Sequence, residues 1–113
     1  METDADLEQL RALYDGEIRY NDAELGRLIN RLRERGEYDE TLIVVCGDHG
    51  DAFKEHGQLT HGHLPYDELS HVPLVIKPPE SANVTQETVD EIASLADVAP
   101  TVLKATTVRV NEK

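Results

Sequence analysis

Residues 41–51 read Thr-Leu-Ile-Val-Val-Cys-Gly-Asp-His-Gly-Asp, an apolar run that ends in glycines, acids and a histidine. Residues 41–46 are nearly all β-branched or apolar, which predicts a strand covered on both faces. Four of the chain's five histidines then fall between residues 49 and 63. Because ligand sites in open α/β sheets lie outside the carboxyl ends of strands, we expect functional side chains where this strand ends.

The segment before this strand has the spacing of an amphipathic helix that runs from Asp6 to about Arg35. Its apolar positions are Leu7, Leu10, Tyr14, Ile18, Leu25, Leu28, Ile29 and Leu32. A glycine in a helix interior is unfavourable, so two helices in line with a break near Gly16 are an alternative to one long helix. Gly36 is a good left-handed cap for the end.

The segment after the strand is rich in glycine and histidine and predicts a long loop over residues 47–65. A second strand is expected at residues 72–77, before Pro78 and Pro79. A polar connector over residues 80–86 follows, residues 89–95 fit either a short strand or a helical turn, and a short helix is expected from Asp97 through Leu103. A helix followed by a buried strand indicates an α/β fold, here a long helix packed on a mostly parallel sheet in a single domain over residues 1–113.

The charge of the chain limits its partners. It has 113 residues, with 23 acidic against 11 basic side chains and a net charge of -12, which repels nucleic acid and anionic membranes alike. Acids spread along the whole chain suit a halophilic protein, with an ordinary acidic cytosolic protein as the alternative. An unfolding midpoint that does not depend on salt would exclude the halophilic interpretation.

The single cysteine excludes an internal disulfide and fits a reducing compartment. No signal peptide is visible, so we expect a soluble cytoplasmic protein.

Asp48 and His49 are candidate metal ligands, because a carboxylate beside an imidazole suits a divalent cation. Gly47 and Gly50 on either side allow a sharp turn and a close approach of the backbone. A polar turn on the surface is the alternative interpretation of this short pattern.

The order of motifs resembles the C-terminal half of the catalytic core of sulfatases, in the alkaline phosphatase superfamily. The matching pieces are Tyr14-Asp15-Gly16-Glu17-Ile18, Leu25-Gly26-Arg27-Leu28, Asp39-Glu40-Thr41-Leu42-Ile43-Val44, Gly47-Asp48-His49-Gly50-Asp51, Glu55-His56-Gly57, Tyr66-Asp67-Glu68, Val72-Pro73-Leu74-Val75-Ile76 and Ala96-Asp97-Val98-Ala99-Pro100-Thr101. The resemblance implies a partial alkaline-phosphatase-like layered fold and a sulfuric ester hydrolase.

The resemblance also implies roles for particular residues. Asp48 and His49 would bind a divalent metal ion, calcium or manganese, and His61 would contact the ester oxygens or the leaving group, with His63 as second choice. His56 matches a recurrent family position, but a loop-anchoring hydrogen bond is an equal reading, and His71 is assigned to structure. The family nucleophile lies in a Cys/Ser-x-Pro-x-Arg motif, which the sequence around Cys46 does not match.

Three functional interpretations follow. We favour a truncated, sulfatase-like fragment with little or no activity alone, because the nucleophile half of the core is absent from these residues. A second interpretation is a working hydrolase of sulfate or phosphate esters, completed by a separate N-terminal half or by homo-oligomerisation. A third is a non-catalytic acidic oligomerisation or binding module. Without the other half of the core, the sheet would have an unpaired edge strand and uncovered apolar surface. We therefore also expect self-association.

Overall fold

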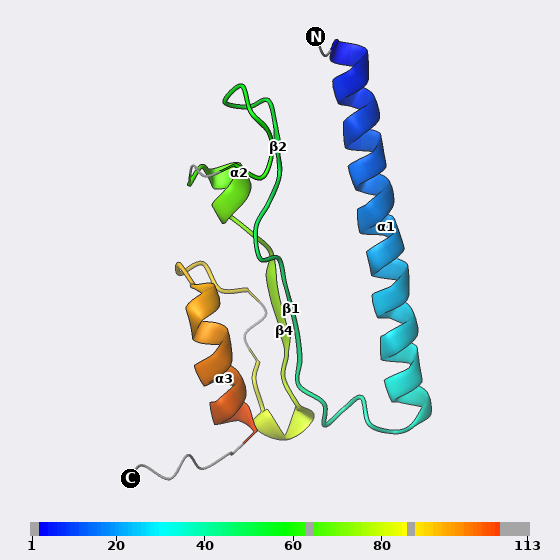
Figure 1. Ribbon diagram of the computed structural model, residues 1–113. Coiled ribbons are helices and arrows are strands. Elements are labelled where there is room, and N and C mark those ends of the chain that lie inside the picture. The colour runs from blue at the N-terminus through cyan, green and yellow to red at the C-terminus, as the bar shows by residue number, and fades with distance from the viewer. Residues whose placement is uncertain (1–2, 63–64, 86–87, 107–113) are drawn as a thin grey trace. The chain divides into compact units, whose positions relative to one another are not determined.

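The computed structural model describes residues 3–62, 65–85 and 88–106 (Figure 1). The chain divides into two compact units. The first unit joins Met1–Tyr38 to His49–His71, and the second joins Asp39–Asp48 to Val72–Lys113. The chain therefore passes from the second unit to the first between Asp48 and His49, where the histidine-rich segment begins.

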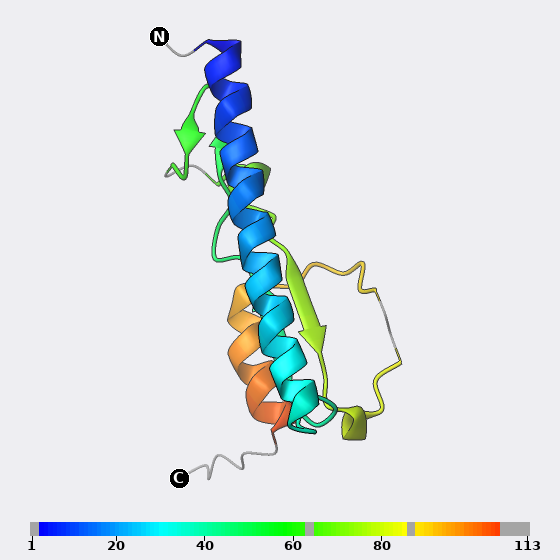
Figure 2. The same ribbon diagram turned by 90° about the vertical axis from the view of Figure 1, so that its right-hand side faces the viewer.

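The first unit begins with one long helix, α1 (Asp4–Glu34), which runs without a break through Gly16 (Figure 2). A capping box starts it: the Thr3 hydroxyl accepts from the Asp6 amide at 3.2 Å, and the Asp6 carboxylate accepts from the Thr3 amide at 2.7 Å. Gly36 has a φ of 68° just past its end, as expected for a left-handed cap. The single-helix alternative is therefore confirmed.

A small antiparallel hairpin occupies part of the segment that the sequence predicts as an irregular loop. Strand β2 (Ala52–Phe53) pairs with β3 (Leu59–Thr60), with Ala52 opposite Thr60. The turn between them is closed by the Lys54 amide, which donates to the Gln58 carbonyl at 2.8 Å. Strands of two residues leave too short an alternating pattern to be recognised in a sequence.

The core of the first unit is small. A short helix, α2 (Asp67–Ser70), follows the hairpin, and the buried hydrophobic side chains among the described residues are Ala52 of β2 and Leu69 of α2. The long helix α1 has no buried residue; its Tyr14 ring packs edge-on against Phe53 with the ring centroids 5.2 Å apart. A few contacts therefore hold α1 to the hairpin.

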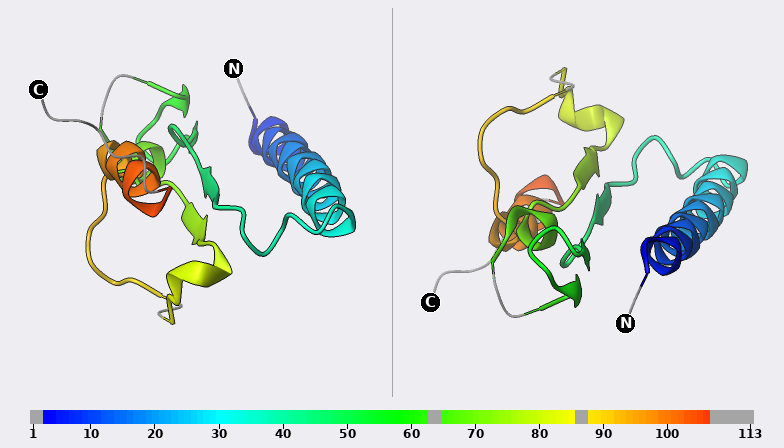
Figure 3. Two further views of the ribbon diagram at one scale, coloured as in Figure 1. Left: turned by 90° about the horizontal axis from the view of Figure 1, so that it is seen from below. Right: turned by 90° about the horizontal axis from the view of Figure 1, so that it is seen from above.

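The second unit contains a two-stranded sheet made of β1 (Ile43–Cys46) and β4 (Leu74–Lys77), seen side by side in Figure 3. The strands are antiparallel, with Ile43 opposite Lys77 and Cys46 opposite Leu74. The mostly parallel sheet predicted from the sequence is therefore wrong, while the mixture of helix and strand is as expected. Burial on both faces is also wrong for β1, because Val45 and Cys46 are exposed.

Short helical turns complete the second unit. The elements are η1 (Glu80–Ala82), η2 (Leu95–Asp97) and α3 (Val98–Ala105). The helix predicted from Asp97 is present, but the capping box lies one turn earlier, where the Asp97 carboxylate accepts from the Ser94 amide at 3.1 Å. Residues 89–94 form neither a strand nor a helix.

Within the described ranges, no helix combines the length and the apolar composition that a bilayer crossing requires. The halophilic and cytoplasmic assignments stay predictions.

Candidate functional site

The two predicted metal ligands lie where β1 ends, and both are exposed. In the second unit, the Gly47 amide donates to the Pro73 carbonyl at 3.1 Å, which fixes the backbone just before Asp48. In the first unit, the Gly50 amide donates to the Leu69 carbonyl at 2.9 Å, which fixes the backbone just after His49. Asp48 and His49 are thus each adjacent to an anchored glycine.

Gly50 lies at a position that has no room for a side chain. A Cβ atom at this position would lie 2.0 Å from the backbone oxygen of Glu68 in α2. The close backbone approach predicted for this glycine is present, and the group approached is a carbonyl of the same unit.

Three potential metal ligands converge in the first unit: His49, Asp51 and His61. The Nδ1 atom of His61 is 3.3 Å from Oδ1 of Asp51, and the His49 and His61 rings have centroids 4.5 Å apart. Each residue offers one ligand atom, and these atoms all lie within 4.8 Å of one another. Two imidazole nitrogens and one carboxylate oxygen form a donor set that fits a divalent cation.

Asp51 is the member of this cluster that was not predicted from the sequence as a site residue. In the sequence, only its position two residues after His49, inside the histidine-rich segment, could have indicated that it belongs to the site. His61 had been predicted as a catalytic residue, and the structure brings it next to Asp51 and His49. His63, the second choice, lies outside the described residues.

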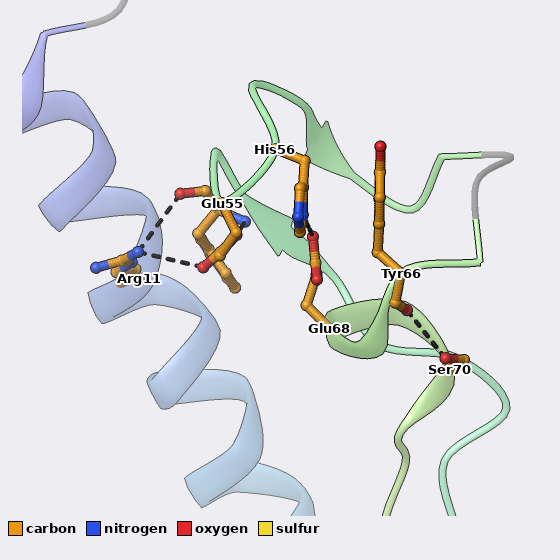
Figure 4. Close-up of polar contacts among 7 residues, drawn as sticks. Arg11, Glu55, His56, Tyr66, Glu68 and Ser70 are labelled. Carbon is orange, nitrogen blue, oxygen red and sulfur yellow. Dashed lines mark hydrogen bonds and ion pairs between the residues drawn. The ribbon is translucent and has the colours of Figure 1, made fainter.

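His56 belongs to a separate contact that fastens the hairpin to α2 (Figure 4). Its Nδ1 atom is 2.7 Å from Oε1 of Glu68, and its ring stacks on Tyr66 with the centroids 3.8 Å apart. The hydrogen bond from His56 lowers the pKa of the Glu68 carboxyl below its ordinary value. These contacts are those expected of a loop-anchoring histidine.

A second contact holds the hairpin turn to α1, also visible in Figure 4. The Arg11 guanidinium lies 3.4 Å from the Glu55 carboxylate and donates to the Phe53 carbonyl at 3.4 Å. His71, assigned to structure from the sequence, ends α2 with its amide donating to the Asp67 carbonyl at 2.8 Å. The hairpin that the three ligands flank is therefore attached to both α1 and α2.

Comparison with known proteins gives the family. The sulfatase family model matches residues 1–108. The chain belongs to the sulfatase family. This family is metal-dependent, and the donor set of His49, Asp51 and His61 agrees with such chemistry.

The sulfatase-family chain is similar to proteins from animals and bacteria. It is 35% identical over 102 residues to arylsulfatase K from Bos taurus, a match of 89% of this chain and 18% of that protein. It is 31% identical over 99 residues to an arylsulfatase from Clostridium perfringens, covering 86% of this chain and 20% of that protein. A multifunctional alkaline phosphatase superfamily protein, PehA of Trinickia caryophylli, is 34% identical over 102 residues, covering 89% of this chain and 20% of that protein.

The chain thus spans about a fifth of the length of the curated relatives it matches. Its assignment to the C-terminal half of the sulfatase core stays a prediction, as do the metal role of Asp48 and His49 and the catalytic role of His61.

Proposed function

We propose that this chain supplies one part of a metal-dependent site that hydrolyses sulfate or phosphate esters. The observation that carries the proposal is the segment Gly47-Asp48-His49-Gly50-Asp51, which follows β1 directly in a chain of the sulfatase family. The names of the relatives, arylsulfatases among them, support an ester of this kind as the substrate.

In this proposal Asp48 and His49 hold a divalent cation, calcium or manganese. When bound, the cation offsets the negative charge of the sulfate or phosphate group. His61 contacts the ester oxygens or the leaving group. The hydrogen-bond contact of its Nδ1 atom with Asp51, at 3.3 Å, supports this role, because it orients the ring and leaves Nε2 for the ester.

The nucleophile is proposed to come from another part of a sulfatase core. None of the 113 residues lies in a Cys/Ser-x-Pro-x-Arg motif, so the chain by itself lacks the covalent chemistry that the family resemblance implies. We therefore propose that the chain forms part of the C-terminal half of the core and has little or no activity alone.

The exposed apolar surface supports association with that remaining part. Among the described residues, large hydrophobic side chains are exposed on α1 and on both strands of the sheet. They include Leu13, Ile18, Leu28, Val45, Val75 and Ile76. We propose that the rest of a sulfatase core covers these residues.

A chimera tests the proposal. In it, this chain replaces the matched region of the Clostridium perfringens arylsulfatase, and hydrolysis of 4-nitrophenyl sulfate and 4-nitrophenyl phosphate is measured with calcium or manganese. We expect turnover by the chimera and none by the isolated chain. Removal of a metal-binding carboxylate in Asp48→Ala should lower turnover by about 100-fold or more.

Two controls make the result decisive. Asp67→Ala removes an exposed carboxylate elsewhere in the first unit and should leave turnover unchanged. Circular dichroism of each variant shows whether it is folded. Full activity of a folded Asp48→Ala chimera would contradict the proposed site.

A further inference from the structure

We propose that His49, Asp51 and His61 form a site for a first-row transition-metal dication such as zinc, held by the first unit of the chain alone. Asp48 is not one of its ligands. The site does not depend on the proposed hydrolase function, although the two would share His49 and His61, and Asp51 contacts His61 in both.

The hairpin explains why Asp51 and His61 meet. Ala52 lies opposite Thr60 in the antiparallel pair of β2 and β3. The next positions outward are Asp51, just before β2, and His61, just after β3. Directly opposed residues of such a pair have their Cβ atoms about 5 Å apart, so one ion can bridge their side chains.

His49 reaches the same place along the chain. His49 lies two residues before Asp51, and its ligand atom is within 4.8 Å of those of Asp51 and His61. The 4.5 Å distance between the His49 and His61 ring centroids agrees with all three side chains lying on one face of the hairpin.

The site has a rigid base and adjustable ligands. Ala52, next to Asp51, is 3% exposed, and the Gly50 amide is bonded to the Leu69 carbonyl at 2.9 Å. By contrast, the His61 side chain is 65% exposed and the Asp51 side chain 29%. The backbone is therefore held in place, while the imidazole can rotate toward an ion.

The spacing suits a small cation after a modest rotation of side chains. Ligand atoms that bind one tetrahedral zinc at about 2.1 Å lie about 3.4 Å apart. The His61 and Asp51 atoms are already 3.3 Å apart, and the full set lies within 4.8 Å. Rotation of His49 closes the remaining gap.

The donor atoms select the class of metal. Calcium and magnesium prefer shells made of oxygen, whereas imidazole nitrogen suits zinc, iron, nickel and copper. Two histidines and one carboxylate also leave a coordination position open for water or another ligand. We therefore expect the cluster to bind zinc and to bind calcium poorly.

Isothermal titration calorimetry tests the proposal, with zinc chloride and then calcium chloride titrated into the full chain at neutral pH. The wild-type chain should bind one zinc ion. Asp51→Asn and His61→Gln should each weaken zinc binding by about 10-fold or more, since even outer-shell changes cost that much. The matched control His71→Gln should leave zinc affinity unchanged. Asp48→Asn separates the two proposed sites, because it removes a ligand of the hydrolase site and none of the zinc site.

Two further readouts separate ligand loss from misfolding. Circular dichroism compares the helix content of every variant. NMR of the imidazole nitrogens shows which histidine resonances shift when zinc is added. We expect the resonances of His49 and His61 to shift and those of His56 to stay unchanged. Binding that survives in both Asp51→Asn and His61→Gln would overturn the proposal. Loss of zinc in Asp48→Asn would also overturn it, by assigning the ion to the proposed hydrolase site, and that outcome would leave the hydrolase proposal standing.

Discussion

At the scale of single residues, Glu68 connects α2 to the hairpin. Its carboxylate lies 2.7 Å from Nδ1 of His56, and its side chain is only 17% exposed. The hydrogen bond from His56 lowers the pKa of Glu68 below its ordinary value of 4.5. The contact therefore favors the ionised carboxylate in the folded chain, which makes its contribution to stability depend on pH.

The sign of this dependence follows from the direction of the shift. Because the folded-state pKa is lowered, the stabilisation is complete above the ordinary pKa and is lost as the pH falls through the folded pKa. We expect the midpoint of thermal unfolding to fall between pH 6 and pH 3 more steeply for the wild-type chain than for Glu68→Gln. Asp67→Asn, at the neighboring exposed carboxylate, should behave as wild type; equal slopes for all three would contradict this.

Gly50 gives a second prediction at the residue scale. A methyl group there would collide with the Glu68 carbonyl, whose oxygen lies 2.0 Å from the added Cβ. We expect Gly50→Ala to lower the free energy of unfolding by about 1 to 3 kcal/mol, measured by urea denaturation. A stability equal to that of wild type would show that the loop and α2 are not in contact as described.

The residues of the candidate site differ in how far the sequence could predict them. Asp48 and His49 stand out because they follow an apolar run and are flanked by glycines. Asp51 joins the cluster only through the pairing of β2 with β3, and two-residue strands carry no readable pattern. The sequence could therefore locate the histidine-rich segment but not which of its members meet.

At the scale of secondary-structure elements, α1 is continuous along its whole length despite its interior glycines. Nothing lies within 4 Å of a Cβ added at Gly16. Because alanine is favoured over glycine by about 1 kcal/mol in a helix interior, Gly16→Ala should raise the free energy of unfolding by a similar amount. Circular dichroism at 222 nm during urea denaturation measures this, and a loss of helix would contradict an unbroken α1.

The elements themselves were largely predictable, and their pairing was not. The long helix α1 and the two strands of the second unit, β1 and β4, lie close to their expected positions, because apolar periodicity is a local property. The direction of β4 relative to β1 depends on the path of the residues between them. That segment turns back through the hairpin and α2, and its sequence shows no sign of the reversal.

At the scale of the whole molecule, the chain buries little hydrophobic surface. Among the described residues, only Ala52 and Leu69 are buried hydrophobics, while Leu28 is 55% and Val75 60% exposed. Such surface is characteristic of contacts with other protein. It agrees with a chain that spans about a fifth of the length of its relatives.

This exposure predicts self-association of the isolated chain. Multi-angle light scattering should give a mass above 12.6 kDa that rises with protein concentration. Val75→Lys, which places a charge on the exposed face of β4, should reduce the association, whereas Glu91→Lys adds the same charge at an exposed polar position and should not. A monomer at every concentration would contradict the prediction.

Anomalous X-ray diffraction from crystals of the arylsulfatase chimera soaked in manganese chloride tests directly whether Asp48 and His49 bind a metal ion. The proposed function predicts a manganese peak within bonding distance of an Asp48 carboxylate oxygen and a His49 nitrogen, and its loss in Asp48→Ala. A well-ordered Asp48 with no manganese bound to it would contradict the assignment of this segment to a sulfatase-type site.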